Sequence, residues 1–325
     1  MNTVDQPYLS RLSYAHTDPL MNLVHDQAMP PHDSFYEAGK FREMAERSYF
    51  LEIDASRVSK HTFGQSYDFT DSFRYFKNDP ISAYFMLHRT ELDNPTQYGY
   101  ASRGQMIQKR NAWLTGLLKK NKEKAFYTAV SDNTNFEGAT YYANVSTAWS
   151  STGLANPMDD VYAGKLIVPN INAGIISKKA FDYLARNQTL SNMTTVSGAR
   201  RDGSVNPLIT LDFLKNVFQL QFLWVASGQL LSDSSDESST TKADIWTNKM
   251  LLFYHNPNPG PDTPAWMQSL FWAPNGKGKG SGGWFVTKTT EDRTGGVGSE
   301  TYDIWNYYQY LVQEKSLAYR IDALY

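Results

Sequence analysis

The chain contains no cysteine among its 325 residues. That absence excludes disulfide frameworks, zinc–thiolate sites, cysteine nucleophiles and iron–sulfur clusters, and it fits folding in a reducing cytoplasm. An excess of either charge is also lacking, since 31 Lys and Arg residues stand against 33 Asp and Glu residues, for a formal net charge of −2. A protein whose main task is to grip nucleic acid needs a basic excess to displace counterions, so this class is disfavoured.

Long apolar runs are missing as well. No stretch approaches the roughly 18 consecutive apolar residues that a membrane-spanning helix needs, so we expect no membrane span. Residues 1–30 carry charged side chains, among them Asp5, Arg11 and Asp26, and contain no apolar core segment. We therefore expect no secretory signal.

Aromatic side chains, by contrast, are abundant. The chain has 21 Tyr, 17 Phe and 8 Trp, yet its mean hydropathy is −0.51. Strands favour aromatic residues, and Tyr and Trp also favour interfaces because one end of each side chain is apolar and the other polar. The composition indicates a β-rich protein, an interface-rich protein, or both.

Residues 1–45 differ from a packed domain. Prolines recur at positions 7, 19, 30 and 31, and the apolar residues come in small groups instead of a sustained period. A segment of this kind predicts an extended arm whose apolar groups need another surface to bury against.

The next fifty residues are rich in aromatic side chains. A strand is expected at 48–58, an aromatic stretch covers 60–76, and a strand-like run covers 81–92 after a break at Asp79-Pro80. These segments predict a long two-stranded excursion. Because an isolated hairpin is marginally stable in water, it needs a partner to pack on.

One long helix is evident from apolar residues at helical spacing between Ala101 and Val130. We expect Asp93 or Asn94 to cap it and Pro95 to lie in its first turn. At 1.5 Å per residue the helix is about 45 Å long.

Seven basic residues and a single acidic one, Glu123, lie on this helix. They allow a nucleic-acid contact or a solvated face. We favour the solvated face, with the last lysines placed at the negative end of the helix dipole. The basic residues are Arg103, Lys109, Arg110, Lys119, Lys120, Lys122 and Lys124.

After Pro157 the chain turns to short elements. Ser177 and Thr210 are predicted N-caps of two helices. The apolar runs 222–226 and 250–254 predict central strands buried on both faces, and 232–244 predicts a surface loop. Further strands are expected at 284–290, 302–312 and 316–324.

No motif predicts catalysis or cofactor binding. The six histidines form no metal-ligand spacing. The segment Gly276–Ser281 lacks the Gly-Lys-Ser/Thr ending and the helical context of a phosphate loop. Asp159-Asp160 and the acidic group at 233–237 fit solvated positions better than a metal site. We therefore predict a protein that is not an enzyme, with no cofactor and no metal.

A series of segments over about a hundred residues agrees in order and spacing with one known fold. The series resembles the A domain of tailed-bacteriophage major capsid proteins, a fold shared with encapsulins and the herpesvirus capsid floor. The segments are Val168–Asn170, Ala173–Ser177, Ala180–Leu184, Ile209–Leu214, Phe222–Gly228, Asp244–Trp246, Leu251–His255 and Leu270–Trp272.

The resemblance implies an α+β capsid fold in five parts. Residues 1–45 would be the N-terminal arm, and 46–95 the extended loop (E-loop) and its flanking strands, which lie over a neighbouring subunit. Residues 96–165 would be the P domain with its long spine helix, 166–283 the A domain, and 284–325 the strands that complete the P domain.

The resemblance also implies self-assembly into the hexamers and pentamers of an icosahedral virion capsid, built in the host cytoplasm around a phage genome. Scaffolding, portal and decoration proteins are the implied partners. Packaged DNA is expected to make weak non-specific contacts, and no membrane is involved. We predict no covalent cross-link between subunits. The expected interface residues are Tyr8, Leu12, Leu20, Phe63, Tyr67, Phe69, Phe73 and Tyr75.

Two alternatives stay open. An encapsulin-like shell that encloses cargo would share the fold, although encapsulins tend to be shorter and lack so long an arm. A carbohydrate-binding β-rich module would use Tyr and Trp as sugar platforms, but it leaves the long helix unexplained.

Overall fold

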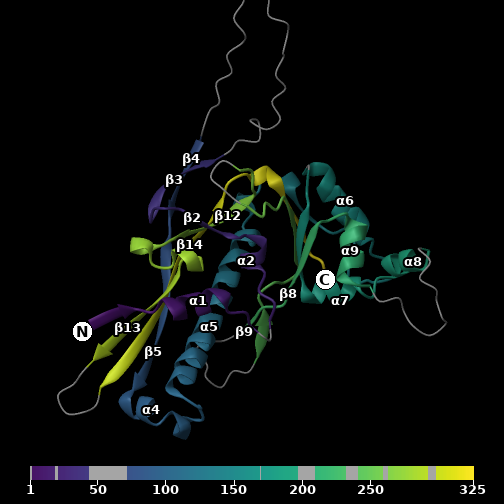
Figure 1. Ribbon diagram of the computed structural model, residues 1–325. Helices are drawn as coiled ribbons and strands as arrows, with labels where there is room; N and C mark the ends of the chain where they lie inside the picture. Colours follow the sequence, from purple (N-terminus) through teal and green to yellow (C-terminus); the bar gives the residue numbers. More distant parts are fainter. Residues whose placement is uncertain are drawn as a thin grey trace, which may run out of the picture.

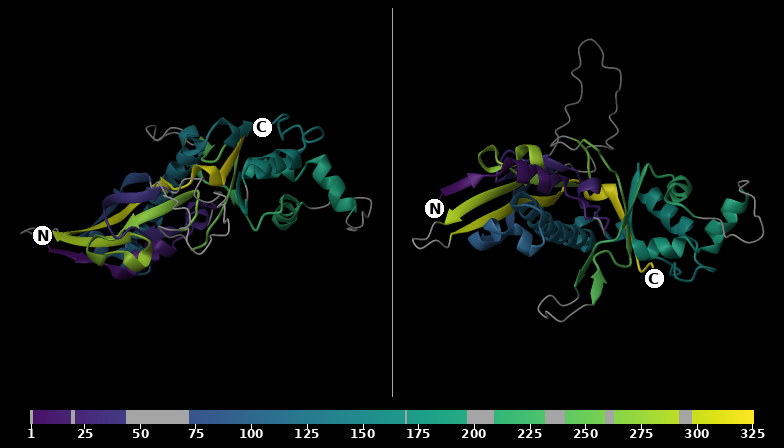
Figure 2. Two further views of the ribbon diagram at one scale, coloured as in Figure 1. Left: turned by 90° about the horizontal axis from the view of Figure 1, so that it is seen from above. Right: turned by 60° about the horizontal axis from the view of Figure 1, so that its bottom comes forward.

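Two sheets joined by one long helix dominate the computed structural model of the protein, which describes residues 2–18, 21–43, 72–168, 170–196, 209–231, 241–258, 263–291 and 298–325. The molecule is elongated, with one sheet in each half (Figure 1, Figure 2). This mixture of helices and strands confirms the predicted α+β class.

Among the described residues, six strands form the larger sheet, in the order β1-β13-β14-β12-β2 with β5 paired to β14 as well. The 14-residue strand β14 pairs with β13 along its first part and with β12 along its last part. Its side chains alternate in burial over most of its length, as strand geometry requires. The strands are β1 (Asn2–Asp5), β2 (Pro31–Asp33), β5 (Asp79–His88), β12 (Met267–Trp272), β13 (Trp284–Glu291) and β14 (Ser299–Val312).

The long helix α5 (Arg103–Ser131) confirms the prediction of a helix over 101–130 and packs on this sheet. Its cap differs from the expected one, because Ser102 Oγ accepts the hydrogen bond of Gln105 N at 3.2 Å. The expected cap residues belong to the short helix α4 (Arg89–Asp93) and to the start of the 3₁₀ turn η1 (Pro95–Tyr98). Met106, Leu114 and Leu118 of α5 are buried in one cluster with sheet residues.

Five described strands form the second sheet, in the order β6-β15-β11-β7-β8. The prediction of central strands is confirmed for β11, whose residues 250–253 are all buried. It is wrong for 222–226, because β8 lies at the edge and its Phe222 and Trp224 are only half-buried. The strands are β6 (Tyr142–Asn144), β7 (Ala173–Ser177), β8 (Phe222–Ala226), β11 (Lys249–Phe253) and β15 (Ala318–Asp322).

Alternate residues of the second sheet enter two different cores. Ile176 and Leu252 face a cluster built with the helices α6, α7, α8 and α9, while Ile175 and Leu251 face a cluster that includes Phe126 at the end of α5. The sheet is therefore covered by helices on one side and by the long helix on the other (Figure 1). The helices are α6 (Pro157–Ile167), α7 (Lys178–Leu184), α8 (Gln188–Val196) and α9 (Leu211–Phe218).

The predicted caps of α7 and α9 are confirmed. Ser177 Oγ accepts from Ala180 N, and Thr210 Oγ1 accepts from Phe213 N, each at 3.2 Å. Both helices are short, so satisfying their first amide groups in this way matters for their stability.

Three strands join a different sheet from the one that the sequence segments suggested, and one of them is β6, which lies in the 96–165 segment but pairs with β15 in the second sheet. Strand β12, placed at the end of the 166–283 segment, pairs with β14 in the larger sheet. Strand β15, placed with the terminal strands of 284–325, pairs with β11 in the second sheet. The chain thus crosses between the two halves more often than its linear order indicated.

The N-terminal segment is more structured than predicted. Pro7 starts a helix, α1 (Pro7–Ala15), and does not interrupt one, because proline is tolerated in a first helical turn. A second short helix, α2 (His25–Ala28), follows, and Leu9 and Val24 are buried within the chain. The expectation of an extended arm without packed elements is wrong for these residues.

The two-stranded excursion begins earlier than predicted. Strand β3 (Ala38–Glu43) pairs with β4 (Ser72–Lys77), so the first strand starts inside the segment assigned to the arm. Residues 44–71, which include the expected strand at 48–58 and most of the aromatic stretch, lie outside the described residues. Strand β5 runs through Pro80, where we expected a break, and proline is compatible with a strand at a sheet edge.

A small ribbon and several 3₁₀ turns complete the described structure. The ribbon pairs β9 (Gln229–Leu231) with β10 (Lys242–Asp244), so the end of the predicted loop at 232–244 is a strand. The remaining turns are η2 (Asn133–Asn135), η3 (Ala139–Tyr141), η4 (Pro274–Gly276), η5 (Lys279–Ser281) and η6 (Lys315–Leu317).

Candidate functional site

The two acidic residues at the start of α6, Asp159 and Asp160, each accept a hydrogen bond from a nearby side chain. Asp160 Oδ2 accepts from the indole Nε1 of Trp149 at 2.8 Å, and Asp159 Oδ2 accepts from Asn156 Nδ2 at 2.7 Å. Burial raises the pKa of Asp160 above its ordinary value. Over the described ranges, no group of three or more His, Asp or Glu residues is placed to hold a metal ion. The acidic group at 233–237 lies outside those ranges.

The glycine- and lysine-rich segment 276–281 forms two 3₁₀ turns against the N-terminal segment. Lys277 Nζ pairs with Asp5 at 2.9 Å, and Lys279 Nζ lies 5.9 Å from the ring centroid of Phe35. Strand β13 follows the turns, so the segment lacks the helix that a phosphate loop requires.

A buried cluster of charged side chains fastens the N-terminal segment to α5, and we call it the arm cluster: His25, Asp26, Lys119, Lys122 and Glu123. Glu123 is fully buried, and its Oε2 accepts from Val24 N at 3.0 Å and from His25 N at 2.9 Å. The same oxygen lies 2.6 Å from His25 Nδ1, and Trp246 Nε1 donates to the other oxygen. The Glu123 carboxylate thus accepts hydrogen bonds both from the start of α2 and from Trp246 in the second half of the molecule.

The arm cluster also contains two lysines that we expected on a solvated face. Lys122 is 1 % exposed; it pairs with Asp26 at 3.3 Å and lies over the ring of Tyr308 at 4.9 Å. Lys119 donates to the carbonyl oxygens of Tyr14 and His16 at 2.8 and 2.7 Å. The prediction of a solvated face is therefore wrong for these two residues, because the N-terminal segment covers them.

The charges of the arm cluster shift its pKa values. Burial alone would lower the pKa of His25, but Asp26 and Glu123 raise it above its ordinary value. Burial alone would raise the pKa of Asp26, but His25 and Lys122 hold it well below its ordinary value. Burial lowers the pKa of Lys119 to about 8, against the opposing charge of Asp26. The shifts favour a charged His25 facing a charged Asp26.

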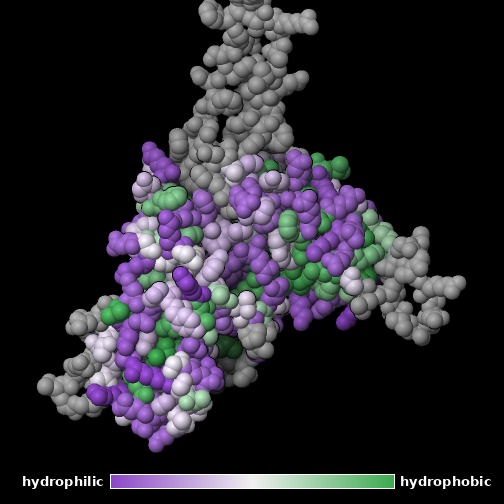
Figure 3. All heavy atoms as spheres, in the orientation of Figure 1, coloured by the Kyte–Doolittle hydropathy of each residue, from purple (hydrophilic) through white to green (hydrophobic). Residues whose placement is uncertain are grey.

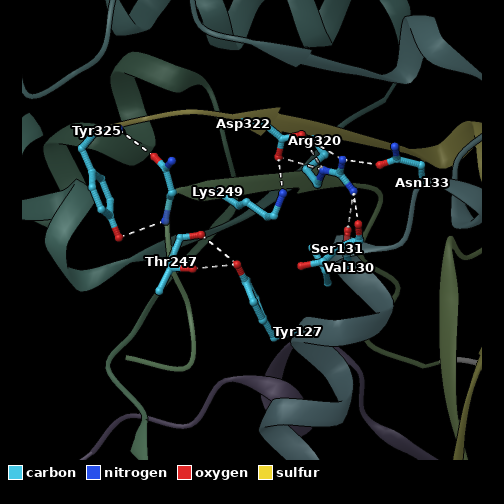
Figure 4. Close-up of polar contacts among 10 residues, drawn as sticks. Tyr127, Val130, Ser131, Asn133, Thr247, Lys249, Arg320, Asp322 and Tyr325 are labelled. Carbon is cyan, nitrogen blue, oxygen red and sulfur yellow. Dashed lines mark hydrogen bonds and ion pairs between the residues drawn. The ribbon is translucent and has the colours of Figure 1, made fainter. Parts of the chain in front are cut away.

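A second polar network joins the end of α5 to the second sheet (Figure 4). The guanidinium of Arg320, on β15, donates to the carbonyl oxygens of Val130 and Ser131 at 3.0 and 2.9 Å. It also donates to Asp322 at 2.8–3.1 Å, and Lys249 Nζ pairs with the same carboxylate at 2.8 Å. Arg320 thus satisfies the last carbonyl groups of α5, which have no partner within the helix.

Tyr325, the last residue of the sequence, also hydrogen-bonds to the second half of the molecule. Tyr325 N donates to Asn248 Oδ1 at 2.7 Å, and the Tyr325 hydroxyl accepts from Asn248 N at 2.9 Å (Figure 4). Leu324 is fully buried. On the α5 side, the Tyr127 hydroxyl donates to the carbonyl oxygen of Thr247 at 2.9 Å. The long helix and the second sheet are therefore held together by side chains from three parts of the chain.

The surface of the described residues carries large apolar side chains that expose a large fraction of their area to solvent. Figure 3 shows groups of hydrophobic residues among hydrophilic ones on the right of the molecule. Contiguous or large exposed apolar groups are typical of interaction sites. The most exposed ones include Leu166 (88 %), Leu154 (84 %), Phe35 and Tyr36 (68 % each) and Trp113 (66 %).

The predicted interface residues fall into three groups. Tyr8 and Tyr75 are 62 % and 76 % exposed, and Leu12 is half-buried. Phe73 lies on β4, where the structure describes the backbone. The others, Leu20, Phe63, Tyr67 and Phe69, lie outside the described residues.

Sequence reasoning did not single out Phe35, Tyr36, Trp113, Leu154 or Leu166 as surface residues. Trp113 follows the helical period of α5 and so resembles a core residue in the sequence. The Asp33-Ser34 pair before Phe35 was a usable turn signal, and it could have indicated that the next aromatic side chains lie on a loop.

No protein-family model matches the sequence, and no curated protein matches it. Solved structures do match. A phage-related protein from Bordetella bronchiseptica RB50 superposes with a TM-score of 0.72 at 17 % identity, covering 100 % of this chain and 98 % of that one. The putative capsid protein of a prophage of Escherichia coli CFT073 superposes with a TM-score of 0.53 at 10 % identity, covering 99 % of both chains.

The chain has the capsid fold of tailed bacteriophages and encapsulins. The SrpI encapsulin of Synechococcus elongatus PCC 7942 matches it as well, with a TM-score of 0.54 at 12 % identity over 92 % of this chain and 86 % of that one. Proteins with this capsid fold are typically structural components of shells and not enzymes. Within the described residues, no helix of this capsid fold combines the length and apolar composition needed to cross a bilayer.

Proposed function

We propose that the chain is the structural subunit of the icosahedral capsid that encloses the genome of a tailed bacteriophage. The observation that carries this proposal is the end-to-end superposition on the Bordetella phage-related protein, at a TM-score of 0.72 against 0.54 for the encapsulin. As a capsid subunit the chain would assemble in the host cytoplasm and reside in the virion.

The five-part organisation is part of the proposal. The larger sheet and α5 serve as the P domain (96–165 with 284–325), and the second sheet with its helices serves as the A domain (166–283). Residues 1–45 are the N-terminal arm, and 46–95 are the E-loop with its flanking strands. Strands β6, β12 and β15 each add to the sheet of the other domain.

The contacts in such a shell are proposed to be made chiefly with copies of the same chain, in hexamers and pentamers. The exposure of Tyr8 and Tyr75 supports a role in these contacts. Scaffolding, portal and decoration proteins are the further partners of a capsid subunit, and packaged DNA would contact the inner wall weakly. Burial of apolar area between subunits supplies association free energy, at about 25 cal/mol per Å² before the cost of ordering is subtracted.

Electron microscopy of the purified chain tests this function. We expect closed shells tens of nanometres across in negative stain, and we expect monomeric bands on a denaturing gel because no cross-link is proposed. Small discrete particles under every assembly condition, with or without the phage's other head proteins, would contradict the proposal. Glycan binding by such particles would instead favour the carbohydrate-binding module.

The second candidate is an encapsulin-like compartment, which the SrpI superposition favours. Both candidates predict closed shells, so the shell contents distinguish them. Shells recovered from the native host are expected to contain nuclease-protected DNA if the chain is a phage capsid protein. Shells that hold a co-purifying protein and no DNA would favour the encapsulin-like compartment.

A further inference from the structure

The segment 33–37, which runs from the last residue of β2 to the residue before β3, presents two aromatic side chains to solvent. Phe35 and Tyr36 are each 68 % exposed. Adjacent aromatic residues with this exposure are costly in water, and aromatic residues are enriched among those that dominate interface energetics. We call residues 33–37 the anchor loop.

The backbone of the anchor loop is strained at Phe35, one of its two exposed aromatic residues. Phe35 has φ of +59°, in the left-handed region that bulky residues rarely adopt. Asparagine or glycine would occupy this position with less strain. Strain of this kind persists only where the surrounding structure enforces it, and it concentrates at functional positions.

Hydrogen bonds to the body of the protein enforce this conformation. Phe35 N donates to Asp33 Oδ1 at 2.9 Å, and Ser34 N donates to the carbonyl oxygen of Phe271, on β12, at 2.9 Å. Asn78 is fully buried beneath the loop, and its Nδ2 donates to Ser34 Oγ at 2.9 Å and to the carbonyl oxygen of Tyr36 at 3.2 Å. The loop is thus fixed in place before any partner arrives, which reduces the entropy lost on binding.

On its own chain, Phe35 has a cation–π contact with Lys279, at 5.9 Å from the ring centroid. Exposed apolar side chains also lie around α6, where Leu154 and Leu166 are 84 % and 88 % exposed. In Figure 1 the anchor loop and α6 lie on opposite sides of the molecule. Two unlike apolar surfaces on opposite sides of one subunit suit a head-to-tail contact between copies, the type of contact that builds rings when its rotation closes.

We propose that Phe35 and Tyr36 form a preorganised aromatic anchor through which one copy of the chain binds a second copy. This inference rests on the proposed self-assembly and adds to it the residues of one contact. The aromatic rings supply the buried area, while Asp33, Ser34 and Asn78 position them without touching the partner.

The test compares Phe35→Asn with wild type in two measurements. Because asparagine tolerates the left-handed conformation, the thermal unfolding midpoint of the free subunit should stay the same or rise by about 2–4 °C. The concentration needed for assembly, followed by light scattering, should rise at least about tenfold. A residue with a merely structural role would give the opposite pattern, with lower stability and unchanged assembly of the folded fraction.

Two further variants complete the design. Gln219→Asn is the matched control, because Gln219 also has a positive φ, of 52°, but carries an exposed polar side chain at the end of α9. It should leave assembly unchanged. Tyr36→Ala removes the second ring and keeps the backbone hydrogen bonds, and it should weaken assembly as Phe35→Asn does.

The absence of cysteine allows a direct test of the partner. In the Glu37→Cys variant, which keeps both rings and places the thiol at an exposed position beside them, a thiol-linked photo-cross-linker should join two copies of the chain on illumination. Normal assembly of Phe35→Asn, or cross-links confined to one chain, would overturn the anchor while leaving shell formation intact. Failure of the wild type to form shells would instead overturn the proposed function, so the two failures are distinguishable.

Discussion

Replacing Arg320 tests whether the network in Figure 4 holds the two halves of the chain together. The Arg320 side chain is 3 % exposed, and its nitrogens donate to the carbonyl oxygens of Val130 and Ser131, to Asn133 and to Asp322. In Arg320→Ala all of these bonds are lost, and the buried carbonyl of Val130 and the part-buried carbonyl of Ser131 lose their side-chain donor. The prediction concerns the free energy of unfolding of the free subunit.

The expected cost follows from what the substitution leaves behind. Removing one partner of a buried ion pair costs about 3–5 kcal/mol when the other charge is left uncompensated. In Arg320→Ala, Lys249 still pairs with Asp322 at 2.8 Å, so the cost of leaving this carboxylate without Arg320 lies near the lower limit of that range. Loss of the cation–π contacts with Phe136 and Tyr142, at 5.2 and 5.1 Å, adds about 0.5–1 kcal/mol. We therefore expect Arg320→Ala to cost about 3–4 kcal/mol.

Urea unfolding followed by circular dichroism measures this cost. Arg320→Lys should recover only part of it, because an ammonium group cannot reach the helix carbonyls and the carboxylate in a fork. The control is Arg89→Ala, whose side chain is 58 % exposed and pairs with Asp93 at 3.6 Å, and which should cost no more than about 0.5 kcal/mol. A cost below about 1 kcal/mol for Arg320→Ala, or wild-type stability for Arg320→Lys, would refute the reasoning.

The remaining predictions concern the arm cluster and one tight helix contact. Because the folded pKa of Asp26 is lowered, its contribution to the free energy of unfolding should be fully present above its ordinary pKa of 3.8. The contribution should disappear as the pH falls through the lower folded pKa, so the difference in stability between wild type and Asp26→Asn should close in acid. The gap for His25→Gln should be full below pH 6.5 and close as the pH rises through the raised folded pKa, and pH-independent gaps in urea unfolding would refute both statements. Gly164→Ala should destabilise by about 1–2 kcal/mol because its Cβ would lie 2.5 Å from the Tyr319 ring, whereas Gly104→Ala, with 3.9 Å to the nearest atom, should stabilise by up to about 1 kcal/mol in the same assay.

Local signals in the sequence were sufficient for several elements. The helical period of α5 and the hydroxyl caps Ser177 and Thr210 depend on neighbours within a few residues, and all three predictions agree with the structure. The boundary of α5 was less accurate, because Pro95 formed a 3₁₀ turn in place of the first helical turn. Resemblance to the capsid fold added the overall architecture that local signals lack.

The arm cluster could not be predicted from the sequence. Lys122 and its partner Asp26 are separated by 96 positions, and Lys119 and Tyr14 by 105, so nothing near either lysine indicates burial. The prediction of a central strand at β8 failed for the same reason, because residues distant in the sequence decide which strands pair. The five apolar residues of 222–226 resemble a central strand, but only the pairing order of the sheet decides that the strand lies at an edge.

The N-terminal segment also changes how the sheets can contact other molecules. Strand β1 pairs along β13, and β2 pairs along β12, so the segment occupies positions where another strand could otherwise add. At β8, the Asn22 side chain donates to the carbonyl oxygen of Val225 at 2.7 Å. At β5, Arg110 donates to the carbonyl oxygen of Met86 at 3.2 Å.

Covered strand edges restrict the ways in which subunits can associate. A free edge pairs readily with any exposed strand and leads to aggregation, which a protein that must form one defined assembly has to avoid. Strands β1, β2 and β6 are themselves edge strands, but they are only 4, 3 and 3 residues long, and short edge strands offer little to a further strand. Side chains and loops carry shape and charge specificity that strand addition lacks. The exposed aromatic rings of the anchor loop suit that role because they are fixed in position and lie outside the hydrogen-bonded ladder of either sheet.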